Sequence, residues 1–241
     1  VEALKHSGIF HGSNVSIRWV DAEQLDDNNA EEQLRGVHGV FVPGGFGPRA
    51  IEGKIAAARW AREQLVPYMG VCLGMQVAVV EFARHIAGMA GANSSEFDPE
   101  SPYPVIDLLP EQKLVEDKGG TMRLGAQPVH LVPGTRAAAA YDATTIAQRH
   151  RHRFEVNLEL RGQLEDAGMV VSGTSPDGRL VEVIELADHP FFVAAQYHPE
   201  FLSRPTRPEP LFREFVRATV AQRESGVESA AGSQSQAPVE Q

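Results

Sequence analysis

The chain has 241 residues, a mass of 26.2 kDa and a formal net charge of −10. An apolar content of 42% is enough for a substantial core, and the length fits one large domain. The negative charge disfavours binding to a nucleic-acid backbone, and no apolar run approaches the ~18 residues of a membrane span. A single cysteine excludes an intrachain disulfide. We therefore expect a cytoplasmic protein that binds neither nucleic acid nor membrane.

Short apolar runs alternate with helical patterns through the first half of the chain. Strands are predicted at Val15 to Val20, Gly39 to Pro43 and Pro67 to Cys72, and helices at Ile51 to Leu65 and Leu73 to Ala87. This alternation predicts an α/β fold in which helices cover both faces of a parallel sheet.

The second half is richer in strands and follows a long predicted loop from Gly91 to Gly120. Helices are predicted at Leu160 to Ala167 and at Pro210 to Arg223, and a hairpin turn at residues 176–178. Strands are predicted at Thr121 to Val132, Thr144 to Asn157, Met169 to Thr174, Leu180 to Leu186 and Phe191 to Tyr197. Residues 225–241 are rich in Ser, Gln, Ala and Gly, which predicts a disordered tail after a domain at 1–224.

The only cysteine, Cys72, lies where a predicted strand meets a predicted helix, in the sequence Gly-Val-Cys-Leu-Gly at 70–74. A nucleophile at such a turn, flanked by small residues, forms an exposed elbow. The helix N-terminus favours a thiolate, and the N–H of Leu73 can stabilise an oxyanion. A buried structural thiol fits the same five residues, so this motif alone leaves both interpretations open.

A histidine and a carboxylate follow another predicted strand, in His198-Pro199-Glu200. Glu200 can hold one imidazole nitrogen while the other faces a nucleophile. His-Pro-Glu alone is more typical of an ordinary loop histidine, but the elbow cysteine makes a catalytic role the better hypothesis.

The glycine-rich run Pro43 to Gly47 separates a predicted strand from a helix. It could be a flexible turn or a phosphate loop, but no Gly-Lys-Ser/Thr follows it. Our preferred interpretation is that its backbone N–H groups form part of an oxyanion site.

These three motifs, in this order and spacing, resemble those of class I (triad) glutamine amidotransferases. Three more narrow the resemblance to the glutaminase domain of CTP synthases: Gly91 to Phe97, Gly119 to Gly125 and Arg149 to Asn157. The resemblance runs from about Val1 to Val220. It implies a three-layer α/β sandwich around a mostly parallel sheet with an added antiparallel strand region.

The resemblance also assigns roles to individual residues. It implies Cys72 as nucleophile, with His198 and Glu200 completing the triad, and a substrate and oxyanion site at Gly44, Gly45, Leu73, Gly74, Met75, Gln76, Glu96 and Arg153. An acid and a base suit the α-ammonium and α-carboxylate of free glutamine. Taken alone, Glu96 is a solvated loop acid, and Arg153 belongs to a basic run whose alternation suggests a strand with two faces.

By resemblance, the domain hydrolyses L-glutamine through a γ-glutamyl thioester and needs no cofactor or metal. In the complete enzyme, a ligase, the ammonia would aminate UTP to CTP with ATP and magnesium, under activation by GTP and in a homotetramer. The amidoligase domain and the family's first strand are not found in this sequence, and Ala50 departs from the family pattern. Two alternatives remain: a stand-alone cysteine hydrolase of γ-glutamyl amides, and a non-catalytic assembly or regulatory module.

Overall fold

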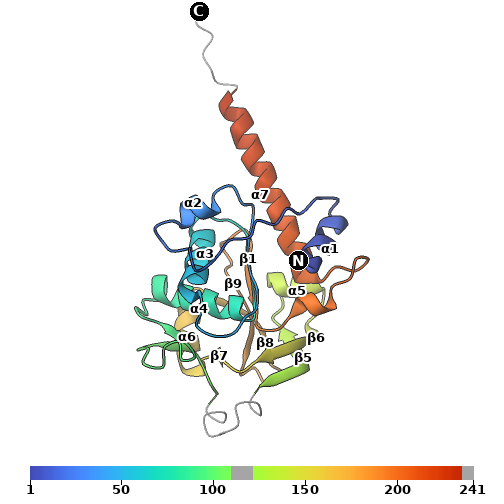
Figure 1. The fold of residues 1–241 in the computed structure, drawn as a ribbon. Helices are drawn as coiled ribbons and strands as arrows, with labels where there is room; N and C mark the ends of the chain where they lie inside the picture. Colours follow the sequence, from blue (N-terminus) through green and yellow to red (C-terminus); the bar gives the residue numbers. More distant parts are fainter. Residues whose placement is uncertain (110–121, 235–241) are drawn as a thin grey trace, which may run out of the picture.

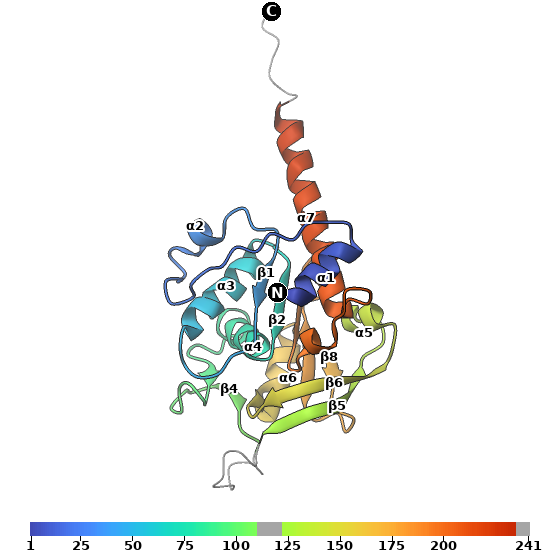
Figure 2. The same ribbon diagram turned by 45° about the vertical axis from the view of Figure 1, so that its right-hand side comes forward.

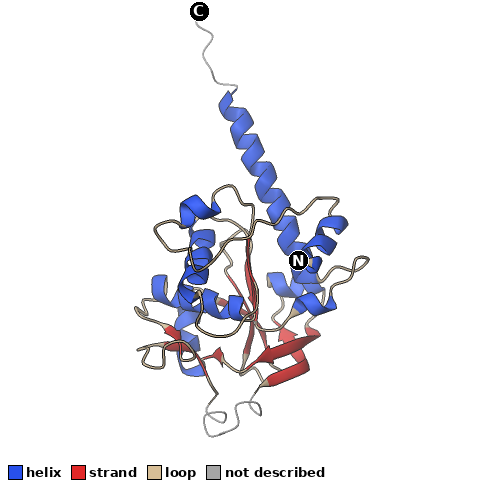
Figure 3. Ribbon diagram, viewed as in Figure 1, coloured by secondary structure: helices blue, strands red, loops and turns tan. Residues whose placement is uncertain are grey.

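The computed structural model describes residues 1–109 and 122–234, with side chains described as far as residue 225. A seven-stranded sheet in the order β1-β2-β10-β9-β8-β5-β6 runs through the described part of the chain, with helices on both faces (Figures 1 and 3). The predicted α/β class is therefore confirmed.

The large sheet is mixed rather than uniform. Parallel pairing joins β1 (Val40–Val42), β2 (Tyr68–Val71) and β10 (Phe192–Ala195). The remaining neighbours pair antiparallel, from β10 through β9 (Val181–Glu185), β8 (Val170–Thr174), β5 (Arg123–Leu131) and β6 (Thr145–His152). We expected a mostly parallel sheet with an added antiparallel region. In the structure, more neighbouring strands pair antiparallel than parallel.

The helices form two outer layers (Figure 2). One face carries α2 (Ala30–Leu34), α3 (Ile51–Glu63) and α4 (Leu73–His85). The other carries α1 (Glu2–Phe10), α5 (Arg136–Tyr141) and α7 (Pro210–Gln234). A smaller sheet of β3 (Asn93–Ser94), β4 (Pro104–Asp107) and β7 (Glu155–Val156) lies beside α4, and α6 (Leu158–Asp166) follows β7.

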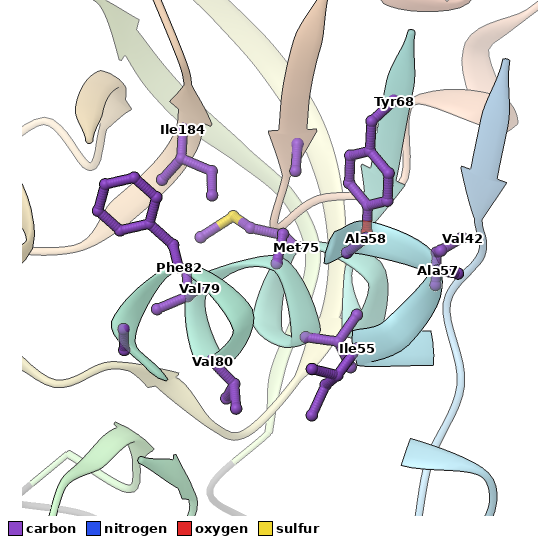
Figure 4. Close-up of a cluster of buried hydrophobic side chains, with 14 of the residues drawn as sticks. Val42, Ile55, Ala57, Ala58, Tyr68, Met75, Val79, Val80, Phe82 and Ile184 are labelled. Atoms are coloured by element: carbon purple, nitrogen blue, oxygen red, sulfur yellow. The ribbon is translucent and has the colours of Figure 1, made fainter. Parts of the chain in front are cut away.

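Successive side chains of the central strands point to opposite faces of the large sheet, so the hydrophobic core is divided into two parts, one on each face. Tyr68 and Phe192 stack at 4.4 Å between ring centroids on the face covered by α3 and α4. Figure 4 shows Tyr68 among the other buried side chains of this face. Their neighbours Met69 and Val193 point to the other face and pack under α1, α5 and α7. Because the central strands are buried on both faces, β2 and β10 are apolar at almost every position.

The outer edge of β1 has no strand partner among the described residues and faces a groove of about 790 Å³. Residues 15–20 line this groove without forming a strand, so the strand predicted there is wrong. Val15 and Ile17 are half-buried while Ser16 and Arg18 are exposed, so burial alternates at first, but the exposed Trp19 breaks the pattern. Periodicity is present, but a strand also requires a neighbour to pair with.

Most other predicted elements are confirmed, with small shifts at their ends. The predicted loop at 91–120 contains β3 and β4 as far as it is described, and the segment 144–157 breaks into β6 and β7 because β7 pairs with β4. The last helix continues past Arg223 to Gln234, so its predicted end is wrong. Residues 225–234 of the tail that was predicted to be disordered are helical, so that part of the prediction is wrong. Residues 110–121 and 235–241 lie outside the described part, and for 235–241 the prediction of disorder stays a prediction. No helix among the described residues has the length and apolar character needed to cross a membrane.

Candidate active site

The single cysteine lies at a sharp turn between β2 and α4. Cys72 is the N-cap of α4 and has φ 53° and ψ −105°, a conformation that few non-glycine residues adopt. Its backbone N–H donates to the carbonyl of Ala195 at the end of β10, at 2.7 Å. The strained residue is therefore held by the neighbouring strand, as expected of a nucleophile elbow.

The glycines on either side of Cys72 are required by space. A methyl group on Gly74 would lie 2.1 Å from the carbonyl oxygen of Val42 in β1. One on Gly70 would lie 2.5 Å from the carbonyl oxygen of Gly74. Both contacts are with backbone, so no side-chain movement relieves them. The elbow is thus built by close approach of β1, β2 and the first turn of α4.

The structure brings His198 and Glu200 to the cysteine. A methyl group on Gly44 would lie 2.8 Å from His198 Cε1 and 3.5 Å from Cys72 Cβ, so this glycine leaves room for both side chains. His198 Nδ1 lies 2.8 Å from Glu200 Oε1, and His198 Nε2 is buried with no hydrogen-bond partner among the described residues. The free nitrogen is the one not used by Glu200, which is the atom a base would present to the sulfur.

The environment of His198 favours its protonated form. Burial lowers its pKa, but the proximity of Cys72, together with the hydrogen bond and charge of Glu200, outweighs burial and raises the pKa to about 9. Both side chains lie beside Gly44, so the imidazole and the cysteine share one part of the site. The sulfur also lies 3.9 Å from the carbonyl oxygen of Arg151 in β6.

Two backbone N–H groups are available near the sulfur. Those of Leu73 and Gly45 have no acceptor within the described ranges, whereas Met75 and Gln76 already donate to the Cys72 carbonyl. The Leu73 side chain lies beside the glycine-rich turn, since a methyl group on Gly45 would meet its Cδ2 at 3.1 Å. This arrangement can hold an oxyanion formed next to the sulfur.

Glu96 and Arg153 lie close enough to interact electrostatically. Burial raises the pKa of the half-buried Glu96, while the Gly47 N–H at 3.4 Å and the charge of Arg153 lower it less. Arg153 follows β6, which ends at His152, whereas the predicted strand ran on to Asn157.

Two predicted substrate residues have other contacts. The Met75 side chain is fully buried in the core and points toward Ile184 of β9, so only its backbone can face the site (Figure 4). Gln76 Nε2 donates to the Phe154 carbonyl at 3.0 Å and to Gln196 Oε1 at 3.2 Å. Its amide nitrogen thus fastens the segment after β6 to α4.

The sequence did not reveal how the inner face of β6 is anchored. His150 Nε2 lies 2.7 Å from Glu182, and His152 Nε2 lies 2.7 Å from Glu155. Arg123 pairs with both carboxylates. The alternation of histidine and arginine was the available signal. Glu155 lies only three residues after His152, whereas Glu182 lies 32 residues after His150 and could not be paired with it from the sequence. Because both histidines are buried, the basic run is not a continuous cationic surface.

The opposite face of β6 carries a second contact that was not predicted. The guanidinium of Arg151 lies 5.5 Å from the ring centroid of Phe46, which belongs to the glycine-rich turn. This cation–π contact joins two walls of the site beside the sulfur. No group of three metal-ligating side chains is found among the described residues.

Comparison with known proteins identifies the family. The sequence model of the family described as "Glutamine amidotransferase class-I" matches residues 1–218. The chain is 61% identical to a CTP synthase of Desulfitobacterium hafniense over 222 residues, covering 92% of this chain and 42% of that protein. It is 62% identical to a CTP synthase of Shouchella clausii over 220 residues, covering 91% and 41%. The chain spans about two fifths of the length of these curated relatives.

A solved structure shows the same fold. The glutaminase domain of Trypanosoma brucei CTPS, described with bound acivicin, has a TM-score of 0.85 and 39% identity, covering 91% of this chain and 86% of that one. The mixed sheet, the elbow and the matched family agree with one another. The chain therefore belongs to the class I glutamine amidotransferases, among the members that form the glutaminase domain of CTP synthases.

Proposed function

We propose that this domain hydrolyses L-glutamine to glutamate and ammonia, with Cys72, His198 and Glu200 as its catalytic triad. The observation that carries the proposal is the position of His198, which bonds Glu200 through Nδ1 and leaves Nε2 free beside Cys72. A nucleophile, a base and a group that orients the base are the parts that acyl transfer needs.

In the first half of the reaction, the Cys72 sulfur attacks the side-chain carboxamide carbon of glutamine. His198 already holds the proton that the thiol gives up, because its raised pKa keeps the imidazole protonated, and the sulfur attacks as a thiolate. The oxygen of the tetrahedral intermediate accepts hydrogen bonds from the N–H groups of Leu73 and Gly45. One such donor is typically worth ~3 kcal/mol. His198 then protonates the departing nitrogen, and the C–N bond breaks to give ammonia and a γ-glutamyl thioester.

In the second half, His198 takes a proton from water, and the resulting hydroxide attacks the thioester carbonyl. The C–S bond breaks, glutamate leaves, and the proton returns to the sulfur. Glu200 accepts a hydrogen bond from Nδ1 throughout and stabilises each imidazolium.

At the other end of the substrate, we assign Glu96 to the α-ammonium and Arg153 to the α-carboxylate of glutamine. Their opposite charges and mutual proximity support this assignment. The raised pKa of Glu96 reflects burial without a direct cation partner, and a bound ammonium would supply that partner. The backbone of Gly44, Gly74 and Met75 and the side chain of Gln76 complete the proposed pocket.

For the whole protein, we propose that the ammonia is used to aminate UTP to CTP, a C–N bond-forming ligase reaction. The support is the high identity to CTP synthases, of which this chain covers about two fifths. ATP, magnesium, UTP and the activator GTP would then bind elsewhere in the complete enzyme, in the cytoplasm and within a homotetramer.

Steady-state glutamine hydrolysis by the wild-type chain and by Cys72→Ala tests the proposal. We expect the alanine variant to lose at least ~10⁴-fold in kcat, the usual effect of removing a nucleophile. Retention of ordinary turnover by Cys72→Ala would contradict it. Faster turnover of larger γ-glutamyl amides than of glutamine by the wild type would favour a stand-alone hydrolase instead.

A further inference from the structure

A chain of buried hydroxyl groups fastens the segment that carries two of the proposed triad residues. Tyr197 directly precedes His198 and is fully buried at the end of β10. Its hydroxyl donates to Tyr141 Oη in α5 at 3.2 Å, and Tyr141 in turn donates to Glu209 Oε1. Through these two bonds, the residue next to the catalytic histidine is tied to the start of α7.

The same glutamate fastens the other end of the segment. The 3-10 helix Pro199–Leu202, which contains Glu200, ends at Ser203. The backbone N–H of Glu209 donates to Ser203 Oγ at 3.3 Å, and His6 Nδ1 lies 3.0 Å from that oxygen. Glu209 is thus the common anchor for both ends of the stretch 197–203.

Counting donors and acceptors shows which form of Glu209 satisfies this network. Tyr141 Oη already accepts from Tyr197 and from Gln148 Nε2, so its single proton must go to Glu209 Oε1. Glu209 Oε2 accepts the N–H groups of Leu211 and Phe212 in the first turn of α7. An ionised Glu209 gives every one of these groups a partner. A proton on Oε1 would point at the Tyr141 hydroxyl, and a proton on Oε2 would point at the two helix N–H groups. In either case two donors face each other, and one of the hydrogen bonds is lost.

We propose that Glu209 is a positioning residue for His198 and Glu200: its backbone N–H holds Ser203, and its carboxylate form, through Tyr141, holds the Tyr197 end of the 197–203 segment in the reactive geometry. The inference rests on the proposed glutaminase activity. It adds a second carboxyl group on which that activity depends, one that touches neither substrate nor sulfur.

Glu209 changes its charge in the range where the enzyme would work. Burial raises its pKa to about 7, against the lowering effect of Tyr141 and the two helix N–H groups. No cation pairs with its carboxylate among the described residues, and the charge of Glu200 raises the pKa further. The titratable or charged groups around the network, from each packed element, are His6, Tyr141, Glu182, Tyr197, Glu200 and Arg213. His198, with a pKa of about 9, stays protonated through this interval.

The test is the pH dependence of glutamine hydrolysis between pH 5.5 and 8.5. We expect the wild-type kcat to fall as the pH drops through about 7, with little change in KM. Glu209→Gln mimics the protonated acid, so its kcat should be low at every pH, by between about tenfold and 100-fold. Its profile should also lack the step near pH 7.

Glu185→Gln is the matched control. Glu185 is also buried and also accepts the first N–H groups of a helix, those of Arg136 and Ala137 in α5, but it has no bond to the 197–203 segment. The Glu185→Gln variant should retain the wild-type decrease in kcat near pH 7. Tyr141→Phe provides a second variant, and Glu209→Gln should have little further effect in its presence. Equal profiles for wild type and Glu209→Gln, or additive effects of the two substitutions, would overturn the inference.

Failure of the proposed function gives a different result. A wild-type chain that does not hydrolyse glutamine at any pH would refute the glutaminase assignment itself. An active wild type whose profile is unchanged by Glu209→Gln would refute only the positioning role.

Discussion

The two sides of strand β1 are packed in opposite ways. On its inner side, the carbonyl of Val42 lies against Gly74, so closely that even a methyl group would not fit. On its outer side, β1 faces a groove of about 790 Å³ and no strand among the described residues. The proposed active site is thus set by backbone-to-backbone contacts, whereas the outer edge is covered only in part by loop side chains. Substitutions should therefore be felt strongly on the inner side and weakly on the outer side.

The largest effect is expected from Gly74→Ala. Its methyl group would meet the Val42 carbonyl at 2.1 Å, and backbone cannot rotate away as a side chain can. We expect the free energy of unfolding to fall by more than ~3 kcal/mol, at the upper end for an overpacked core position. Chemical denaturation measures this change.

Gly162→Ala is the control for that experiment. Gly162 lies inside α6, and a methyl group there would meet no atom within 4 Å. It should stabilise the chain by about 0.5–1 kcal/mol, the helix propensity difference. Similar losses from both substitutions would show that the packing at the elbow is not as close as described.

A smaller effect is expected from the titration of His198. Its pKa is near 6.5 when unfolded and about 9 when folded, so it stabilises the fold fully below pH 6.5 and loses this contribution as the pH rises through about 9. After discounting for solvent screening, we expect a loss of about 1–2 kcal/mol across this interval. Denaturation at pH 6 and pH 9.5 measures it.

Cys72→Ala tests whether the sulfur contributes to this pH dependence, because Cys72 is among the groups that raise the pKa of His198. The variant should lose less stability over the same interval. An equal pH dependence in both proteins would mean that the sulfur and the imidazole do not interact.

Ala50→Gly should have a modest stabilising effect. Ala50 precedes α3 with φ 57° and ψ 30°, the left-handed conformation that costs a non-glycine residue about 1 kcal/mol. Glycine relieves this strain but gains entropy when unfolded, so we expect a net gain of about 0.5 kcal/mol. A lower midpoint of thermal unfolding for the glycine variant would contradict this explanation.

The smallest effect is expected on the outer side of β1. Trp19 lines the groove but is 79% exposed, so Trp19→Ser removes little packing. The free energy of unfolding should change by less than about 0.5 kcal/mol, as at other surface positions. A loss as large as that of Gly74→Ala would erase the contrast between the two sides.

The sequence could predict features that depend on neighbouring residues, but not features that depend on contacts between distant segments. The elbow was found because its local requirements, a strand, two small residues and a helix start, are all met within five residues. The order of the strands was harder, because the antiparallel half depends on which strands meet and not on their own patterns. The strand predicted at residues 15–20 is absent for the same reason, because these residues have a strand-like sequence but pair with no neighbouring strand.

The candidate site divides in a similar way. Residues whose proposed roles depend on backbone position, such as Cys72 and Gly44, lie at the turns where the sequence predicted them. Met75 and Gln76 lie in the expected turn, but their side chains pack against the protein instead of facing open space. The network at Glu209 could not be predicted, because its members come from distant segments and carry no shared pattern.

The most direct test is the reaction of Cys72 with a glutamine-analogue electrophile, followed by intact mass measurement of the folded protein. Because the chain has one cysteine, a single adduct identifies the site. We predict rapid, saturable formation of one adduct that glutamine slows, and a much slower reaction in His198→Ala. An adduct that forms at the same rate in both proteins, or no adduct on the folded wild type, would contradict the assignment of Cys72 and His198 as a reactive pair.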